Sequence, residues 1–401
     1  MRPAVQPGHS EPSVAGLAAL VLAAGTSSRM GEFKPLLPLA GISAFERCIS
    51  LFRAAGVAEV IAVLGHRADE LRPLAERYGA RCVMNTQFDQ GMYSSIVAGS
   101  RALPDWAKGA FVLPADTPLV RATTIRQLAE AFDPRQEGVV YPVFAGHRGH
   151  PPLIAQSILA EAARDEASGP LFALLARHEH RAVDLPVADE AIHMDMDTPA
   201  DYFALVALET RRDIPTAAEC EAILAARHVN EAVIRHSRKV AEVAQRVAFA
   251  LKSTGLILNT ELVQAAALLH DLAKGEADHA SVGATILRSM DFPKVAEVVG
   301  AHTDLGLSFA LDEKAIVYLA DKLVRGEQSA SIAERFQPAL DRFSGDPVAH
   351  QAAERRMRTA MEIAFAVERR LGSPLSFVAC EESNSTYRQI SASIAHQVVN
   401  G

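Results

Sequence analysis

Six side chains that could bind metal ions are spread over the second half of this 401-residue sequence. They are four histidines and two aspartates: His236, His270, Asp271, His279, His302 and Asp321. Several follow apolar runs directly, as in "AAALLHDLAKG" and "AIVYLADKL". A buried imidazole or carboxylate is costly unless it is hydrogen-bonded or bound to metal. Any one histidine could be a helix cap or a hydrogen-bonded core residue, but the ordered set predicts a metal centre between facing helices.

A different chemical pattern lies near the N-terminus, in "LVLAAGTSSRMGEFK" from Leu20 to Lys34. A strand-like run ends there in small residues around Gly25, which would let backbone N–H groups approach an anion closely. Arg29 and Lys34 add the positive charge that a triphosphate requires. The spacing fits neither the Walker A pattern nor the dinucleotide-binding GxGxxG pattern. An ordinary strand–turn–helix junction is the alternative that composition alone allows.

The two patterns fall in parts of the chain with different periodicity. From Leu17 to about Leu208, buried strand-like runs such as "LAALVLAAG" and "EVIAVLGH" alternate with amphipathic segments. This alternation predicts an α/β, Rossmann-like domain with a mostly parallel sheet and helices on both faces. After the charged, proline-containing segment 211–216 the periodicity is helical throughout, which predicts an all-α bundle. We therefore expect a flexible N-terminus (1–16), an α/β domain (17–210) and a helical domain (211–401).

The phosphate-loop segment "LAAGTSSRMGEFK" resembles the LAAGxSxRMGxxK signature of the MobA-like nucleotidyltransferases, which activate molybdenum cofactor and related small molecules. "GMYSSIVAG", "LPADTP", "GHPP" and "DMDTPADY" follow in the order that the family has. The double alanine of "LAAG" is similar to the cytidylyltransferase branch. The resemblance implies transfer of a nucleotidyl group, CMP from CTP, to a phosphorylated small molecule such as molybdopterin cofactor. A sugar phosphate or an alcohol phosphate is the alternative acceptor.

The same resemblance implies roles for individual residues. Asp116 and Asp197 would hold Mg²⁺, an ion that prefers carboxylate and phosphate oxygens, although each could instead be a turn or cap residue. His150 would lie near the acceptor or, alternatively, serve the turn. The residues expected at the nucleotide are Leu22, Ala23, Ala24, Gly25, Ser27, Arg29, Lys34, Gly91, Ser94 and Ser95. Arg29 and Lys34 would neutralise the triphosphate while pyrophosphate leaves, so positioning and charge suffice without a protein nucleophile.

In the second half, "HSRKVAEVA", "LLHDLAKG" and "YLADKLVRG" resemble the H…HD…D frame of the HD-domain metal-dependent phosphohydrolases. His279 and His302 match the two further histidines of family members that hold two metals. The resemblance implies that His270 binds one metal, that Asp271 bridges both, and that Lys274 reaches a substrate phosphate; a solvated helix-end lysine is the alternative. Ligands of this kind suit iron, manganese, cobalt or zinc, with iron or manganese expected first. Hydrolysis of a phosphate ester or phosphoanhydride follows.

Composition narrows the setting of these two activities. The net charge of −8 gives no bulk attraction to nucleic acid or to an anionic membrane. The four cysteines form no CxxC pair, and the polar N-terminal segment lacks the apolar run of a signal peptide. We predict a bifunctional cytoplasmic enzyme that uses an NTP, a phosphorylated acceptor and two kinds of metal site. The rival interpretation is a nucleotidyltransferase whose HD half senses a nucleotide without turnover.

Overall fold

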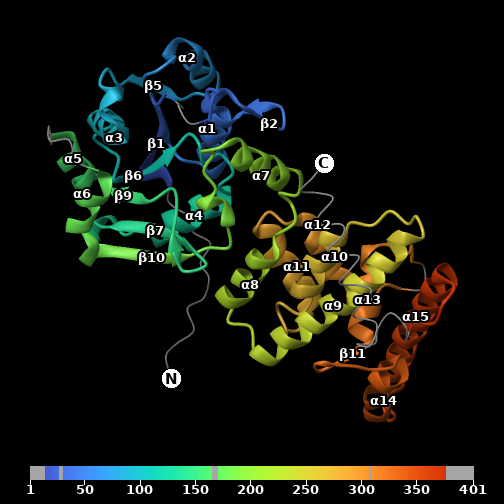
Figure 1. Cartoon of the computed structure of the whole chain (residues 1–401). Helices are drawn as coiled ribbons and strands as arrows, with labels where there is room; N and C mark the ends of the chain where they lie inside the picture. The colour runs from blue at the N-terminus through green and yellow to red at the C-terminus, as the bar shows by residue number, and fades with distance from the viewer. Residues whose placement is uncertain (1–13, 27–29, 165–169, 307–308, 376–401) are drawn as a thin grey trace. The chain divides into compact units, whose positions relative to one another are not determined.

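The computed structural model describes residues 14–26, 30–164, 170–306 and 309–375 (Figure 1). The chain divides into two compact units, Met1–Arg212 and Asp213–Gly401. Of the N-terminal segment expected to be flexible, residues 1–13 lie outside the described ranges, and Val14–Gly16 form a short 3₁₀ helix. Ser27 and Arg29 also lie outside the described residues. No helix within the described ranges is both long and apolar enough to cross a membrane.

An eight-stranded sheet forms the centre of the first unit, in the order β10-β7-β9-β6-β1-β4-β5, with β8 paired to β7. The strands are β1 Leu17–Ala23, β4 Glu59–Leu64, β5 Arg81–Met84, β6 Gly109–Pro114, β7 Val139–Phe144, β8 His147–Arg148, β9 Leu153–Ala155 and β10 Ala182–Pro186. β1 pairs in parallel with both β4 and β6, whereas β8 and β9 pair antiparallel. The prediction of an α/β fold is confirmed, and the sheet is mixed.

Helices cover both sides of this sheet, with α1 and α4 on one side of β1 and α3, α5 and α6 on the other (Figure 1). All seven residues of β1 are buried, which explains its continuous apolar sequence. The helices of the unit are α1 Ala44–Ala55, α2 Ala68–Arg77, α3 Met92–Arg101, α4 Ala122–Ala131, α5 Gln156–Arg164, α6 Leu171–Arg177 and α7 Pro199–Thr210. A small hairpin, β2 Pro38–Leu39 with β3 Ile42–Ser43, precedes α1.

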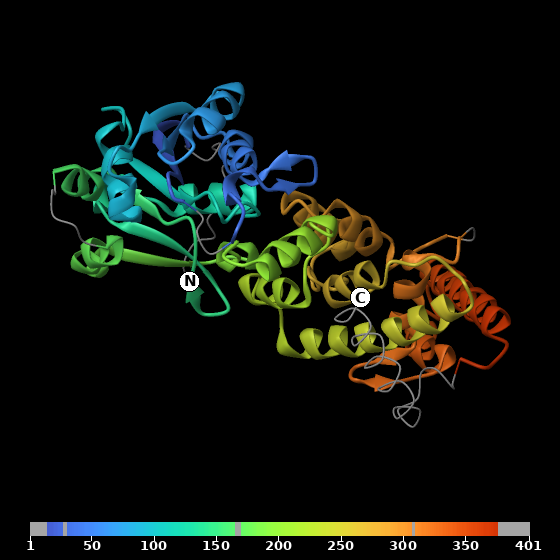
Figure 2. The same ribbon diagram turned by 45° about the horizontal axis from the view of Figure 1, so that its top comes forward.

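Over the residues described between 213 and 375, the second unit is helical, as predicted, apart from one hairpin of two-residue strands, β11 Val324–Arg325 and β12 Gln328–Ser329 (Figure 2). Strands this short leave no alternating pattern in the sequence, and the sequence analysis does not anticipate them. The helices are α8 Ala217–Ala226, α9 Glu231–Ser253, α10 Thr260–Leu269, α11 His279–Ser289, α12 Pro293–Ala301, α13 Glu313–Lys322, α14 Ile332–Arg342 and α15 Pro347–Leu371.

Two neighbouring helices show how this unit places polar groups in its interior. α9 buries Val240, Val243, Val247 and Leu251, a spacing that lines one face of an amphipathic helix. α10 is buried on nearly every side. The Asn259 side chain caps its N-terminus by accepting hydrogen bonds from the Glu261 and Leu262 amides. Its apolar sequence is therefore that of a central helix, and His270 and Asp271, which follow it directly, are buried in the core.

Candidate active sites

The loops after β1 and β6 meet at one edge of the sheet, because these strands run in parallel with Leu22 opposite Pro114. The Ala115 amide donates to the Leu22 carbonyl at 3.0 Å and fixes the start of the second loop. Gly65, after β4, approaches the first loop so closely that a Cβ would stand 2.9 Å from the Ala24 carbonyl oxygen. Asp116 and the residues around Ala24 therefore face the same space.

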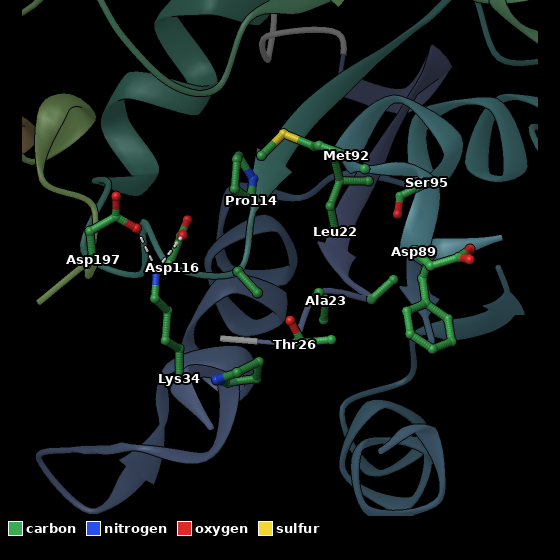
Figure 3. A pocket seen from close by; sticks show the side chains of 16 residues that line it. Leu22, Ala23, Thr26, Lys34, Asp89, Met92, Ser95, Pro114, Asp116 and Asp197 are labelled. Atoms are coloured by element: carbon green, nitrogen blue, oxygen red, sulfur yellow. Dashed lines mark hydrogen bonds and ion pairs between the residues drawn. The ribbon is translucent and has the colours of Figure 1, made fainter. Parts of the chain in front are cut away.

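That space, which we call the β1–β6 cavity, has a volume of about 530 Å³ (Figure 3). Seven of the residues expected at the nucleotide line it: Leu22, Ala23, Ala24, Gly25, Lys34, Gly91 and Ser95. Asp116 and Asp197 line it too, whereas Ser94 does not. Phe88 and Asp89 also line the cavity but belong to no motif quoted from the sequence, and Met92 lines it from within "GMYSSIVAG".

Charged groups gather at one end of the β1–β6 cavity, where Lys34 lies between two carboxylates (Figure 3). Its Nζ donates to Asp197 Oδ1 at 2.5 Å and to Asp116 Oδ2 at 3.3 Å. Burial acts to lower the pKa of Lys34, but the bonds and charges of the two aspartates outweigh burial and raise it. Lys34 is therefore a fixed cation, and its ammonium is shared by the carboxylates of Asp116 and Asp197.

Backbone contacts hold the two aspartates together although they lie far apart in the sequence. The Met196 amide donates to the Asp116 carbonyl at 3.0 Å, which places Asp197 beside the end of β6. Thr198 then caps α7 in a capping box with Asp201. Asp195 shares this acidic surrounding, since burial and then the charges of Asp197 and Asp116 raise its pKa. Two carboxylates thus meet here, Asp116 from the end of β6 and Asp197 from just before α7.

A buried amide supports the opposite end of the cavity. Asn85, directly after β5, is 3% exposed, and its Nδ2 donates to Ser94 Oγ at 2.8 Å and to Ser95 Oγ at 3.0 Å. Its Oδ1 accepts from the Gln87 amide at 2.9 Å. Ser94 thus links Asn85 to the start of α3, where its hydroxyl also donates to the Gly91 carbonyl, and Ser95 lines the cavity. The sequence analysis missed Asn85, whose only signal is a polar residue at a strand end.

A second space, the β7 cavity, has a volume of about 540 Å³ and is lined by Thr117, His150, Phe172, Ile192 and Asp195, among others. Thr117 is 1% exposed, and the structure gives its hydroxyl no hydrogen-bond partner within the described ranges. Burial lowers the pKa of His150, which favours a neutral ring at neutral pH. Thr117 follows Asp116 directly in the chain, so the two cavities lie on either side of the same strand end.

In the second unit all six predicted metal ligands converge on one centre. They form two groups in which the ligand atoms lie within 4.8 Å of one another. The first triad is His236, His270 and Asp321; the second triad is Asp271, His279 and His302. Asp271 connects them, since its Oδ2 lies 3.5 Å from His270 Nε2 and its Oδ1 lies 3.2 Å from His279 Nε2. The chain brings five helices to this point.

Backbone carbonyls orient three of the four rings. The Nδ1 atoms of His236, His270 and His302 lie 2.8, 2.8 and 2.6 Å from the carbonyls of Gly326, Ala267 and Val299. Because a carbonyl can only accept, each Nδ1 carries the hydrogen, and in a neutral ring Nε2 keeps its lone pair. These lone pairs point into the centre, the arrangement that ligation by Nε2 requires.

The donors of this centre fit metal ions. His270 is fully buried, and its Nε2 has no hydrogen-bond partner among the described residues. Burial lowers the pKa of His270 to about 4, although the two nearby carboxylates act in the opposite sense. His279 Nε2 and His302 Nε2 face each other at 3.2 Å. An orphaned buried nitrogen beside two aspartates fits metal ions held by nitrogen and oxygen ligands.

Comparison with known proteins agrees with both sites. The profile of the MobA-like NTP transferase domain matches residues 19–182, and that of the HD domain matches residues 233–326. The nicotine blue oxidoreductase of Paenarthrobacter nicotinovorans is 30% identical over 203 residues, 49% of this chain and 97% of that protein. The chain belongs to the MobA-like NTP transferase family. Its second unit is an HD phosphohydrolase domain with candidate histidine and aspartate metal sites.

Other relatives show how far this likeness extends. The molybdenum cofactor cytidylyltransferase of Escherichia coli K12 is 27% identical over 187 residues, 46% of this chain and 92% of the relative. Longer bifunctional relatives match over less of their length, 22% for the bifunctional IPC transferase and DIPP synthase of Rubrobacter xylanophilus. The crystal structure of Rv0371c from Mycobacterium tuberculosis is 26% identical, covers 48% of this chain and 98% of its own, and has a TM-score of 0.42.

Lys274 is the one predicted HD residue whose described contact differs from the expected role. Its Nζ lies 2.9 Å from Asp271 Oδ2 and 3.1 Å from Asp271 Oδ1, so it pairs with the connecting carboxylate. The side chain is 47% exposed and can reach solvent from this position. Contact with a substrate phosphate remains a prediction for this lysine.

Proposed function

We propose that the MobA-like domain of this chain transfers CMP from CTP to a phosphorylated small molecule, with molybdopterin cofactor as the first candidate. The observation that carries this proposal is the cluster of Lys34, Asp116 and Asp197 at one end of the β1–β6 cavity. Two carboxylates that share an ammonium are suited to Mg²⁺, which would supply charge neutralisation to a triphosphate when bound. Lys34 is then the cation available to the phosphates beside it.

The β7 cavity supports a separate position for the acceptor. Its unpartnered Thr117 hydroxyl and buried His150 offer polar contacts, and Phe172, Leu175 and Ile192 offer apolar surface. An acceptor with one phosphate and a largely apolar body fits this mixture. The phosphate would then enter beside Asp116, where the two cavities adjoin. A neutral His150 donates or accepts a hydrogen bond there without adding charge.

Nucleotide choice is the sharpest test of this reading. The full chain is incubated with each NTP and with molybdopterin, sugar-phosphate or alcohol-phosphate acceptors, and pyrophosphate release is measured. We expect CTP to exceed GTP by about a hundredfold in kcat/KM, roughly 2.7 kcal/mol of differential transition-state binding. A preference for GTP in direct competition contradicts the cytidylyl assignment and leaves the family unchanged. Electron transfer without pyrophosphate release would instead favour chemistry of the kind named for the Paenarthrobacter relative.

For the HD domain we propose hydrolysis of a phosphate ester or phosphoanhydride. Iron or manganese ions held by the two triads would supply Lewis acidity toward a phosphate oxygen. The chain itself orients the rings through backbone carbonyls, excludes water from His270, and keeps Lys274 beside Asp271. All six ligand positions are kept, which a nucleotide sensor without turnover would not need. Metal analysis together with phosphatase assays on the metal-loaded chain separates the two.

A further inference from the structure

The short β11–β12 hairpin lies between α13 and α14 in the chain (Figure 1). Asp321 lies in the last turn of α13, and the hairpin reverses the chain directly afterwards. The Ala330 amide donates to the Leu323 carbonyl at 2.8 Å and closes the reversal. A capping box between Ser331 and Glu334 then starts α14. Arg335 is placed by these contacts beside the first triad.

Arg335 faces the metal centre without being bonded to it. Its guanidinium lies 3.8 Å from Asp321 Oδ1, which is an ion-pair distance and too long for a hydrogen bond. Its Nε is buried and has no hydrogen-bond partner among the described residues. The side chain as a whole is 35% exposed, so a ligand could reach it from solvent. The exposed part of the side chain is available to an anionic ligand, and hydrogen bonds between a guanidinium and an anion are among the stronger ones in proteins.

Asp321 does not need Arg335 as its counter-ion. Its Oδ2 accepts from Lys322 Nζ at 2.5 Å, and its Oδ1 lies 3.2 Å from His236 Nε2. Lys322 is itself buried, over the ring of Tyr318, and also donates to the His302 carbonyl at 3.2 Å. The carboxylate thus already has a buried lysine and a histidine as close partners. Arg335 is a further positive charge beside it at a longer distance, 3.8 Å, and can bind another anion.

We propose that Arg335 is a substrate-binding residue of the HD centre, whose guanidinium binds the anionic oxygens of the substrate phosphate. The inference rests on the proposed phosphohydrolase function and assigns it a residue outside the matched HD range, 233–326. Arg335 would hold the phosphate on the side of Asp321, and Lys274 on the side of Asp271. A planar guanidinium can donate two parallel hydrogen bonds to phosphate, which an ammonium cannot.

The test compares Arg335→Gln with Arg342→Gln, an exposed arginine at the other end of the same helix. Both full-length variants and the parent are loaded with manganese, and metal content is measured by mass spectrometry. Binding of inorganic phosphate is followed by calorimetry, and hydrolysis is followed with p-nitrophenyl phosphate and with ADP. We expect Arg335→Gln to keep its metal and to weaken phosphate binding by roughly ten- to a hundredfold, the scale of lost charge-assisted hydrogen bonds. KM should rise similarly, and Arg342→Gln should match the parent.

The possible results separate the role of Arg335 from the proposed hydrolase function. Unchanged phosphate affinity and KM in Arg335→Gln overturn the inference, and so does loss of metal, which would make Arg335 a support of the ligands. A metal-loaded parent chain that neither binds phosphate nor hydrolyses either substrate contradicts the proposed function instead. Should Arg335→Gln fail to fold, Arg335→Lys is measured in its place. It keeps the charge without the planar fork and should show a smaller loss, whereas full activity in it overturns bidentate binding.

Discussion

The two candidate sites of this chain treat their charges in opposite ways. In the MobA-like domain, Asp116 and Asp197 have side chains that are 26% and 38% exposed, and they share the ammonium of Lys34. In the HD domain, His270, Asp271 and His302 are at most 3% exposed, and His270 Nε2 has no hydrogen-bond partner in the described part of the chain. The first site pairs its two carboxylates with a lysine and leaves them partly exposed. The second buries nitrogen and oxygen donors in a set that fits metal ions.

Energetics explains why the two arrangements differ. A partly exposed carboxylate such as that of Asp197 keeps much of its hydration, and its pairing with Lys34 is screened by solvent. A carboxylate in the protein interior loses that hydration and requires compensation from charges and hydrogen bonds. For Asp271, burial would raise the pKa, but His270, His279, His302 and Lys274 together hold it well below its usual range. Removing one member should therefore damage the HD centre more broadly than the other site.

Replacing the connecting carboxylate should produce the largest change. Asp271→Ala removes the residue whose two oxygens face both triads, and we expect metal content to fall from about two per chain towards none. HD hydrolysis should fall by about a thousandfold or more, whereas pyrophosphate release should be unaffected. Asp341→Ala, on the exposed side of α14, serves as the matched control. Two metals retained at full occupancy would show that Asp271 is not a shared ligand.

Replacing Asp116 should act only on the other site. Asp116→Ala removes one of the two carboxylates at Lys34, and nucleotidyl transfer should fall by about a thousandfold, roughly 4 kcal/mol. Metal content and HD hydrolysis should remain at the parent level, because the sites share no ligand. Asp105→Ala, an exposed position in the same domain, is the control. Undiminished pyrophosphate release by Asp116→Ala removes this residue from the cation site.

A smaller effect is expected where the HD centre is most open. His279 has a side chain that is 24% exposed and belongs only to the second triad. His279→Ala should lower metal content from about two towards one per chain and leave the first triad filled, since His236, His270 and Asp321 remain. Spectrometric metal counting with His350→Ala as control measures this directly; His350 lies on α15, outside both triads. Complete metal loss would mean that the two positions fill only together.

The helical half shows how much of a site the sequence can predict. The convergence of the six candidate ligands could be predicted, because polar residues that end apolar helical runs are rare and their order is informative. Arg335 could not, since a single arginine on an amphipathic helix has the pattern of an ordinary solvated residue. Its position depends on the β11–β12 hairpin, whose two-residue strands are too short to leave a periodic signal.

The α/β half shows a different limit. Its fold and most cavity residues could be predicted from the buried strands and the loop motif, but ion pairing could not. Lys34 pairs with residues 82 and 163 positions away, and several carboxylates were equally available in the sequence. The antiparallel strands β8 and β9 were also missed, because strands of two and three residues are too short to show a periodic pattern. Partner choice over such separations is decided by tertiary structure.

The smallest effect is expected at Asn85, which does not line the β1–β6 cavity and contacts it through Ser95. Asn85→Ala removes the donor to both serine hydroxyls and the acceptor of the Gln87 amide. A buried hydrogen-bond partner is worth about 1–3 kcal/mol, and we expect KM for the NTP to rise about tenfold with little change in kcat. If Asn85 acts by orienting Ser95, then Asn85→Ala combined with Ser95→Ala should raise KM by less than the product of the single effects. Additive effects on KM, or a lowered Tm with KM unchanged, would show that Asn85 supports only the fold of the strand end. In that case nucleotide binding in the β1–β6 cavity would depend on Lys34, Asp116 and Asp197 alone. The two sites would then differ more, because hydrogen bonds orient the rings of the HD centre in advance.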